Sequence, residues 1–368
     1  MSKSTRDNMI TYGIVPIAFI IVQILEAGNL ISNLMSGLLV SFCIYIILAV
    51  SLNLTVGILG ELSLGHAGFM CLGAFTSAFF SKCTVDVITF APLRFILALL
   101  IGAAVAGLAG ILIGLPVLRL KGDYLAIVTL AFGEIIKNVI NALYVGRDQN
   151  GFHASLKDAL SLNMTDDGEV IIDGALGIIG TPRDSSLLVG VLLILLTLFI
   201  VLNLIKSRDG RAIMSIRDNL IAAESVGINI TKYKLMAFSI SAALAGVAGV
   251  LYAHNLNSLA ATTRNFGYNM SIMILVFVVL GGIGNIRGSM IAAVVLTLLP
   301  ELLRGLDKYR MLIYAVVLIL MMLFNWSPKI VAWRKQHTTR YFINKIFRRE
   351  LKPANIDQNT ADQNKGGQ

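Results

Sequence analysis

Long apolar runs constrain this chain more than any other feature of its sequence. Charged residues make up only 14% of its 368 residues, against about 25% in a soluble domain. A membrane-spanning helix needs about 20 mostly apolar residues, and ten runs approach that length: about 11–25, 38–59, 62–81, 94–118, 124–145, 186–205, 235–256, 269–282, 288–303 and 311–326. The sequence therefore predicts an all-α polytopic integral membrane protein with about ten transmembrane helices.

Two of these regions need separate interpretation. The first run is short and follows Lys3 and Arg6, as in a signal peptide, but no small-residue cleavage site follows it, so we expect it to be retained. The eighth and ninth runs are short and are separated by the glycine-rich stretch 281–288. A re-entrant or broken helix is expected there.

The distribution of Lys and Arg predicts the orientation in the membrane. Basic residues dominate the loop 206–234 and the link 119–123, whereas acidic residues dominate the loop 146–185. Since cytoplasmic loops carry the excess of Lys and Arg, we expect 206–234 and both termini in the cytoplasm and 146–185 outside. The basic link 304–310 departs from this pattern, because the number of spans places it outside.

The domain organisation expected from this pattern is simple. Residues 1–326 form a transmembrane domain, and residues 327–368 form a cytoplasmic tail that is first basic and then, from about 353, almost without apolar residues. A segment of that composition cannot bury enough surface to become ordered, so we expect its end to be disordered. The net charge of +9 lies mainly in this tail, which indicates a membrane flank rather than nucleic-acid binding.

The sequence contains no pattern typical of an enzyme. Its four histidines and three cysteines are scattered, without metal-ligand spacing. It has no GxxxxGK[ST] phosphate loop and no nucleophile with a recognisable base. We therefore expect no catalysis and no cofactor in this chain.

Small residues recur at every fourth position in two of the spans. One set is Gly102, Ala106, Gly110 and Gly114, and the other is Ser241, Ala245, Gly249 and Ala253. Such stripes let the backbone of a neighbouring helix approach closely. Tight packing is the expected role, and a sliding interface for conformational change is the alternative.

Glu134 is the most informative charge within a span. It lies 11 residues after Asp123, which corresponds to a depth of about 16 Å in a helix. An acidic group at that depth needs a partner, and Lys137, one helical turn further on, can supply it. Asn138 and Asn141 extend the same polar face. An ion pair that orders the bundle and a role along a polar pathway for a zwitterionic solute both remain open.

The stretch 211–226, in the basic loop, has the pattern of an amphipathic helix. Its apolar face comprises Ile213, Ile216, Leu220 and Ala223, and Gly227 follows as a C-terminal cap would. Such a helix could lie at the membrane interface or fit a groove on a soluble partner.

Four stretches together resemble one known family. They are 52–78, which contains SLGHAGF; 120–139, which contains FGEIIK; 210–253, which contains SIRDNLIAAESVGIN; and 275–304, which contains GGIGNIRG. This pattern is similar to that of the LivM-type permease subunits of branched-chain amino-acid ABC transporters. The stretch from 210 to 304 is the most specific, because a long ordered pattern matches there rather than one short motif.

The resemblance implies partners and a mechanism. A second permease chain of the LivH type would lie beside this one in the bacterial inner membrane, with two cytoplasmic ATPase subunits below and an external solute-binding protein. ATP and Mg²⁺ would bind only to the ATPase subunits. The loop around 206–234 would be the segment that receives the ATPase stroke, through Arg211, Arg217, Asn219, Ala222, Ala223, Glu224 and Gly227.

The same resemblance implies a translocation region. In GELSLGHAGFM, Ser63, Gly65 and His66 lie where small and polar residues meet near the pathway, and Glu134, Lys137 and Asn138 join them. Glu61 stands where the family usually has Gln, and we expect it to be solvated at the cytoplasmic end of the span. Cargo within this family also includes urea, amides and other amino acids. Outside the family, the alternative is an ion-coupled secondary transporter, for which Glu134 is the one strong candidate carboxylate.

Overall fold

The computed structural model describes residues 3–323, except 29–32, 121, 150, 163, 165–167, 304–308, 310, 311, 314, 317, 321 and 322. The expected tail, 327–368, and most of the 304–310 link lie outside the described residues. The chain divides into two units, Met1–Met311 and Leu312–Gln368. In the second unit, which includes most of the tenth expected span, the described positions between 312 and 323 are helical.

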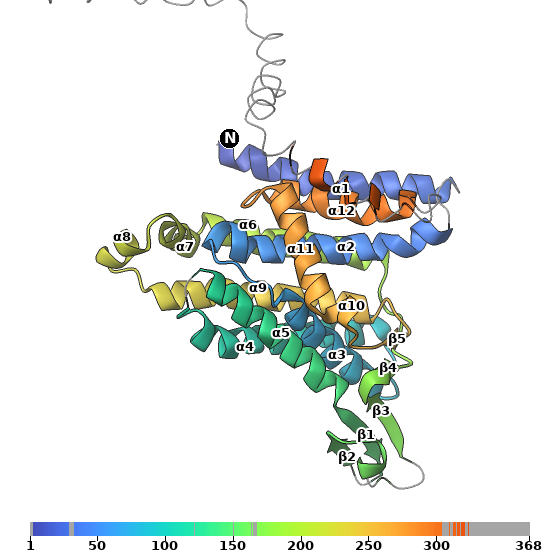
Figure 1. Cartoon of the computed structure of the whole chain (residues 1–368). Coiled ribbons are helices and arrows are strands. Elements are labelled where there is room, and N and C mark those ends of the chain that lie inside the picture. The colour runs from blue at the N-terminus through green and yellow to red at the C-terminus, as the bar shows by residue number, and fades with distance from the viewer. Residues whose placement is uncertain are drawn as a thin grey trace, which may run out of the picture. The chain divides into compact units, whose positions relative to one another are not determined.

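The first unit is predominantly helical (Figure 1). Its helices are α1 (Lys3–Ala27), α2 (Asn33–Asn53), α3 (His66–Thr84), α4 (Ala91–Val117), α5 (Asp123–Asn141), α6 (Leu187–Lys206), α7 (Arg208–Asp218), α8 (Leu220–Ser225), α9 (Ile230–Ala253), α10 (Thr263–Phe266), α11 (Tyr268–Gly281) and α12 (Ile286–Leu302). A π-helical turn, η1 (Leu54–Leu59), continues α2. Helices α3, α4 and α9 pack against one another, and α2 connects this group to α6, α11 and α12.

Five helices among the described residues are long and apolar enough to cross a membrane. They cover Gly37–Leu59, Ala91–Val117, Leu187–Lys206, Ile230–Ala253 and Thr263–Gly281, and a shorter apolar helix covers Thr11–Glu26. The membrane character of the chain is thereby supported. The full set of ten spans is not confirmed by this measure, because α3, α5 and α12 are helical but are not among the five.

The expected break in the region 281–288 is confirmed. Helix α11 ends at Gly281 and α12 begins at Ile286. Gly282 and Gly284 in the connection have φ of +94° and +80°, a backbone conformation that glycine adopts without steric cost. Gly281 and Gly288 also face each other so closely that a Cβ on Gly288 would lie 1.8 Å from the Gly281 oxygen.

The expectation of an all-α protein is wrong in the loop between α5 and α6. Strands β1 (Tyr144–Asp148), β2 (Gly151–Ser155) and β3 (Glu169–Asp173) form an antiparallel sheet in the order β2-β1-β3, and β4 (Ile178–Ile179) pairs with β5 (Ser258–Leu259). The sequence DQNG at the β1–β2 turn is a hairpin signal. The Gly151 amide donates to Asp148 Oδ1 at 3.1 Å there.

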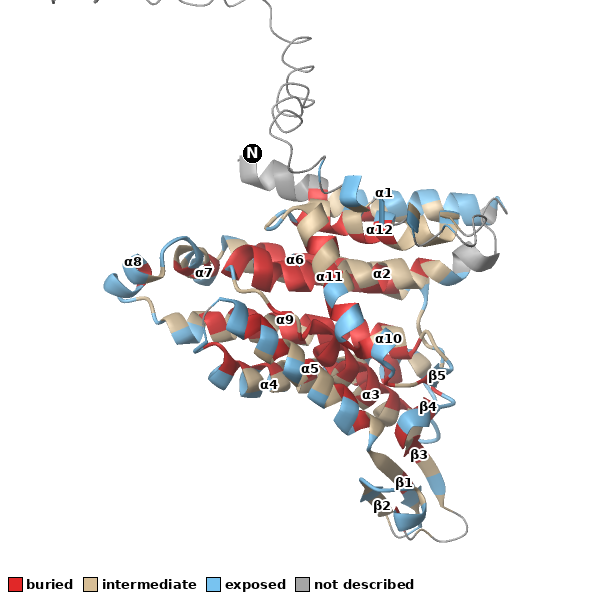
Figure 2. Cartoon of the chain, in the orientation of Figure 1, coloured by how far each residue is buried: buried red, intermediate tan, exposed pale blue. Residues whose placement is uncertain are grey.

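The stripes of small residues lie at close helix crossings. The α4 stripe faces α9, where a Cβ on Gly110 would meet the Ala242 methyl at 2.7 Å. The α9 stripe faces other neighbours: a Cβ on Gly249 would lie 2.1 Å from the Met70 oxygen of α3, and Ser241 Oγ donates to the Ser51 oxygen of α2. Figure 2 shows the resulting buried core along α2, α3, α6 and α9. Tight packing is therefore the role that the structure supports for both stripes.

Candidate functional site

The stretch GELSLGHAGFM connects η1 to α3 and is built for close packing. Gly60, with φ of +83°, ends the π-helical turn, and the chain runs without regular structure until α3 begins at His66. The His66 ring is buried, and its Nε2 lies 2.7 Å from Ser51 Oγ on α2. Since the Ser51 hydroxyl donates its proton to the Leu48 oxygen, it accepts from Nε2. His66 thus holds the start of α3 against α2.

The same stretch lies against the backbone of α5. The Leu64 amide donates to Thr129 Oγ1 at 3.0 Å, and a Cβ on Gly65 would lie 2.3 Å from the Thr129 oxygen. Ser63 is buried as well, and its hydroxyl has no hydrogen-bond partner among the described residues. Ser63, Gly65 and His66 therefore lie inside the protein, where α5 covers them.

Glu134 and Lys137 form the expected ion pair and join three elements. Lys137 Nζ lies 2.5 Å from Glu134 Oε2 and donates to Thr263 Oγ1 on α10 at 3.1 Å. The other carboxylate oxygen of Glu134 accepts the backbone amide of Tyr268, the first residue of α11, at 2.6 Å. A carboxylate at this place also interacts favourably with the positive end of the α11 dipole. We call these four residues the α5–α11 clasp.

Outside the clasp, α5 and α11 expose a face of mixed polarity. Ala131, Ile135 and Asn138 are exposed on α5, and Asn269 and Ile272 are exposed on α11. The Glu134 side chain is 24% exposed beside them, whereas that of Lys137 is 6% exposed. Exposed asparagines within apolar helices are unfavourable toward lipid, so this face suits contact with protein or water. Of the six expected pathway residues, Asn138 lies fully on it and Glu134 borders it.

The amphipathic segment is two helices rather than one. The prediction of a continuous helix over 211–226 is wrong, because α7 ends at Asp218 and α8 begins at Leu220. Asn219 lies between them with an extended backbone, and its side-chain oxygen caps α8 by accepting the Ala222 amide at 3.0 Å. Asn commonly caps helix N-termini, and this preference is the signal for the break.

The predicted cap at Gly227 is confirmed. Gly227 has φ of +83°, and its amide donates to the Glu224 oxygen while the Ile228 amide donates to the Ala223 oxygen, at 3.0 and 3.1 Å. These two bonds form a Schellman motif. The motif turns the chain sharply from α8 back toward α9.

The residues of these two short helices divide between the core and the surface, and of the expected coupling residues Ala223 is buried. Ile213, Ile216 and Ala223 are buried against the protein. Asn219, Ala222, Glu224 and Gly227 are exposed, together with two large apolar side chains, Ile221 and Val226, which are 78% and 75% exposed. We call Ile221, Ala222, Glu224 and Val226 the α8 surface. In Figure 1, α8 lies at the edge of the first unit, away from the helices of the core.

Two arginines attach this segment to the bundle. Arg211 Nη1 donates to the Lys206 oxygen at the end of α6 at 3.0 Å. Arg217 Nη1 donates to the Gly57 oxygen in η1 at 2.9 Å, while its Nε and Nη2 contact Asp218 Oδ1. Arg211 and Arg217 therefore stabilise the attachment of α7 to the bundle. The α8 surface, which follows α7, stays exposed.

The expectation that Glu61 is solvated is wrong. Its carboxylate pairs with Lys234 of α9, and their side chains are 16% and 6% exposed. Ser51, Thr129 and Thr263, which bind His66, Leu64 and Lys137, were likewise absent from the expected site. Each partner is more than ten positions away in the sequence, so no local spacing could have identified it.

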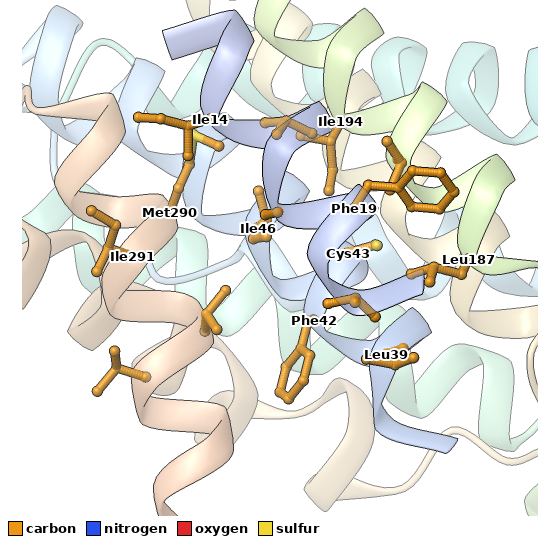
Figure 3. Close-up of a pocket in the computed structure, with 16 residues that line it drawn as sticks. Ile14, Phe19, Leu39, Phe42, Cys43, Ile46, Leu187, Ile194, Met290 and Ile291 are labelled. Atoms are coloured by element: carbon orange, nitrogen blue, oxygen red, sulfur yellow. The ribbon is translucent and has the colours of Figure 1, made fainter. Parts of the chain in front are cut away.

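One apolar cavity among the described residues does not suit a polar solute. It has a volume of about 290 Å³ and lies between α1, α2, α6 and α12 (Figure 3). Its lining includes Phe19, Cys43, Ile194 and Met290, and every lining side chain is apolar. An amino acid or urea would lose its hydration there without gaining hydrogen bonds. The α5–α11 face is therefore the better candidate for contact with such a solute.

Comparisons with known proteins match most of the chain. The family model described as branched-chain amino acid transport system / permease component matches residues 34–324. The high-affinity branched-chain amino acid transport system permease proteins LivM of Salmonella typhimurium and of Escherichia coli are each 37% identical over 295 residues, which are 78% of this chain and 67% of theirs. The ribose import permease protein RbsC of Escherichia coli is 32% identical over 126 residues, 32% of this chain and 39% of its own. No solved structure matches the chain.

Proposed function

Because the chain belongs to the family of branched-chain amino acid transport system permease components, we propose that it moves leucine, isoleucine and valine across the bacterial inner membrane. It is the permease subunit of an ATP-driven importer and a multi-pass membrane protein. The absence of a phosphate loop from its sequence agrees with this role. ATP hydrolysis belongs to partner subunits in this proposal.

The proposed assembly has four kinds of component. This chain pairs in the membrane with a second, related permease, and two ATPase subunits bind on the cytoplasmic side. An external binding protein delivers the amino acid. The excess of Lys and Arg in 206–234 supports a cytoplasmic location for α7 and α8, and the acidic loop 146–185, with its small sheet, would then face outward.

The α8 surface is the structural observation that supports the part of the proposal in which ATPase subunits drive the permease. Two exposed apolar side chains, Ile221 and Val226, flank Glu224 on a short helix that is capped at both ends. A rigid apolar surface with a charged rim fits a groove on a protein partner. We propose that the ATPase subunits provide that groove, so that their movement on ATP binding reaches the permease through α7 and α8.

The α5–α11 face is proposed to line the translocation pathway. Its exposed Asn138 and Asn269 offer hydrogen bonds, and Ile135 and Ile272 offer apolar contact. A branched-chain amino acid needs both, because it has charged backbone groups and an apolar side chain. The second permease would close the opposite side of the pathway.

Reconstituted transport tests the proposal. The chain is tagged and expressed in its native cells, purified in mild detergent and analysed for co-purifying proteins by mass spectrometry. The complex is then placed in proteoliposomes with its binding protein, and uptake of labelled leucine, isoleucine, valine and urea is measured with and without ATP.

The expected result is co-purification of an ATPase and a second permease, with ATP-dependent uptake of the three amino acids. Uptake of urea in preference to leucine would contradict the proposed cargo but leave the proposed ATP-driven importer intact. Uptake driven by an ion gradient without ATP would contradict the importer and favour an ion-coupled transporter.

A further inference from the structure

The π-helical turn η1 lies between two regions that the proposed function must connect. It continues α2 over Leu54–Leu59, and the Gly60 amide closes it by donating to the Thr55 oxygen, five residues back. A π-helical turn has one more residue in each hydrogen-bonded ring than an α-helix and is frequent at functional sites. All six of its residues are buried.

On one side, η1 is fastened to α7. Arg217 Nη1 donates to the Gly57 oxygen at 2.9 Å. The Arg217 side chain also lies against Gly60, where a Cβ would meet its Cγ at 2.5 Å. In addition, η1, α7 and α9 share a hydrophobic cluster of buried residues, formed by Leu54, Ile58 and Leu59 of η1, Ile213 of α7 and Ala237 of α9. A displacement of α7 therefore acts directly on η1.

On the other side, η1 is fastened to the break between α11 and α12. Asn53, which precedes η1 and is fully buried, donates from Nδ2 to Ser289 Oγ of α12 at 2.9 Å. Its Oδ1 accepts the amide of Gly284, in the break itself, at 2.9 Å. One side chain thus holds both the connection and the start of α12.

Gly57 brings the two attachments together. Its oxygen accepts from Arg217, and its Cα lies directly against the break, since a Cβ there would meet the Gly284 nitrogen at 2.4 Å. The same Cβ would meet Asn53 Oδ1 at 1.9 Å. No side chain separates η1 from the break at this point, so the contact is backbone on backbone.

From this geometry we infer that η1 is the transmission element between the α7–α8 segment and the α11–α12 break, with Asn53 and Gly57 as its positioning residues. The inference rests on the proposed function, because it assumes that α8 receives movement from an ATPase. The inference assigns η1 a second state, in which its hydrogen bonds run four residues back as in an α-helix, rather than five residues back. Such a two-state element is what coupling between separate sites requires.

The first test removes the attachment of Asn53 and measures coupling. The complex carrying Asn53→Ala is reconstituted, and ATP hydrolysis is measured with and without amino-acid-loaded binding protein. Stimulation by the loaded binding protein is expected to fall at least tenfold relative to wild type, with a parallel fall in uptake. Thr197→Ala is the matched control, because Thr197 is equally buried but, among the described residues, bonds only to Leu193 of its own helix α6.

The outcomes separate the inference from the proposed function. Stimulation in Asn53→Ala equal to that in Thr197→Ala would overturn the transmission role and leave the importer intact. A wild-type complex that shows no stimulated hydrolysis would overturn both. Assembly of the complex is measured by co-purification of the ATPase, and we expect it to match wild type in both variants.

The second test uses milder changes at the two ends of η1. Ser289→Ala removes one partner of Asn53, and Arg217→Gln weakens the bond to Gly57 while keeping a donor. If η1 transmits, the double variant is expected to show stimulation within twofold of the weaker single variant. Effects that multiply, as expected for independent sites, would overturn the inference.

Discussion

At the scale of single residues, the Glu134 carboxylate has two roles to separate, one in stability and one in transport. Its carboxylate binds Lys137 on its own helix and the first amide of α11, so it orders the bundle wherever the pathway lies. Its 24% exposure beside Asn138 also leaves it open to a passing solute. The ion-pair and pathway interpretations are therefore compatible, and a pair of substitutions can separate them.

Glu134→Gln is expected to lower both stability and uptake. The variant leaves the Lys137 ammonium, 6% exposed, without its counter-charge. The loss should be smaller than the about 3–5 kcal/mol of breaking a fully buried pair, because Glu134 is partly exposed. Thermal unfolding in detergent measures stability, and labelled leucine uptake measures function.

The double variant Glu134→Gln/Lys137→Met is the companion measurement. It removes both charges, so we expect stability to return toward wild type. If uptake stays low although stability recovers, the charged pair contributes to the pathway beyond its structural role. Full recovery of uptake together with stability would reduce the pair to a structural contact.

Gly65→Ala is expected to destabilise the protein by about 1–3 kcal/mol, the usual cost of overpacking. The added Cβ would lie 2.3 Å from the Thr129 oxygen, and backbone cannot move aside easily. Gly13→Ala in α1 is the control, because nothing lies within 4 Å of a Cβ there. A melting temperature of Gly65→Ala equal to that of the control would contradict the close packing of α3 on α5.

At the scale of elements, the α8 helix is where a partner is expected to act. Glu224→Lys should abolish uptake at normal membrane levels, because it reverses the charge beside Ile221 and Val226 on the α8 surface. Arg208→Glu is the control: it also reverses an exposed charge, but at the start of α7, where a negative charge suits the helix dipole. Equal uptake in the two variants, at equal expression, would exclude the α8 surface as the docking site.

Gly227→Pro tests the cap rather than the surface. Proline fixes φ near −65° and has no amide hydrogen, whereas Gly227 has φ of +83° and donates to Glu224. The turn after α8 should therefore be lost, and with it ATPase co-purification. Gly227→Ala keeps the amide and its Cβ meets no neighbour within 4 Å. Its only cost is the positive φ, which alanine adopts less readily than glycine, so a partial loss of ATPase co-purification is expected. An intact complex with Gly227→Pro would show that the turn is dispensable.

Elements were predictable from the sequence to the extent that their signals are local. The apolar runs identified the helices, the glycines at 281–288 identified the break, and Gly227 identified a helix end. The sheet and the division of 211–226 were missed, although DQNG and Asn219 are local signals for both. The partners of Glu61 and His66 could not be found, because they depend on how distant helices pack.

At the scale of the whole molecule, the orientation in the membrane remains a prediction from Lys and Arg. A single cysteine tests it in the background Cys83→Ser, since Cys43 and Cys71 are buried. With a membrane-impermeant maleimide on intact cells, Lys157→Cys between β2 and β3 should be labelled. Ser225→Cys in α8 should be labelled only after the membrane is opened. Labelling of both positions on intact cells would contradict the expected topology.

The glycine crossings have a consequence for how sequences of this kind can diverge. A Cβ on Gly73 of α3 would lie 2.4 Å from the Gly246 oxygen of α9, and one on Gly246 would meet the Ala106 methyl of α4 at 2.5 Å. Neither glycine can be replaced alone unless a helix moves. Across related transporters we therefore expect these positions to stay fixed while the lipid-facing positions drift, whatever cargo each transporter has come to carry.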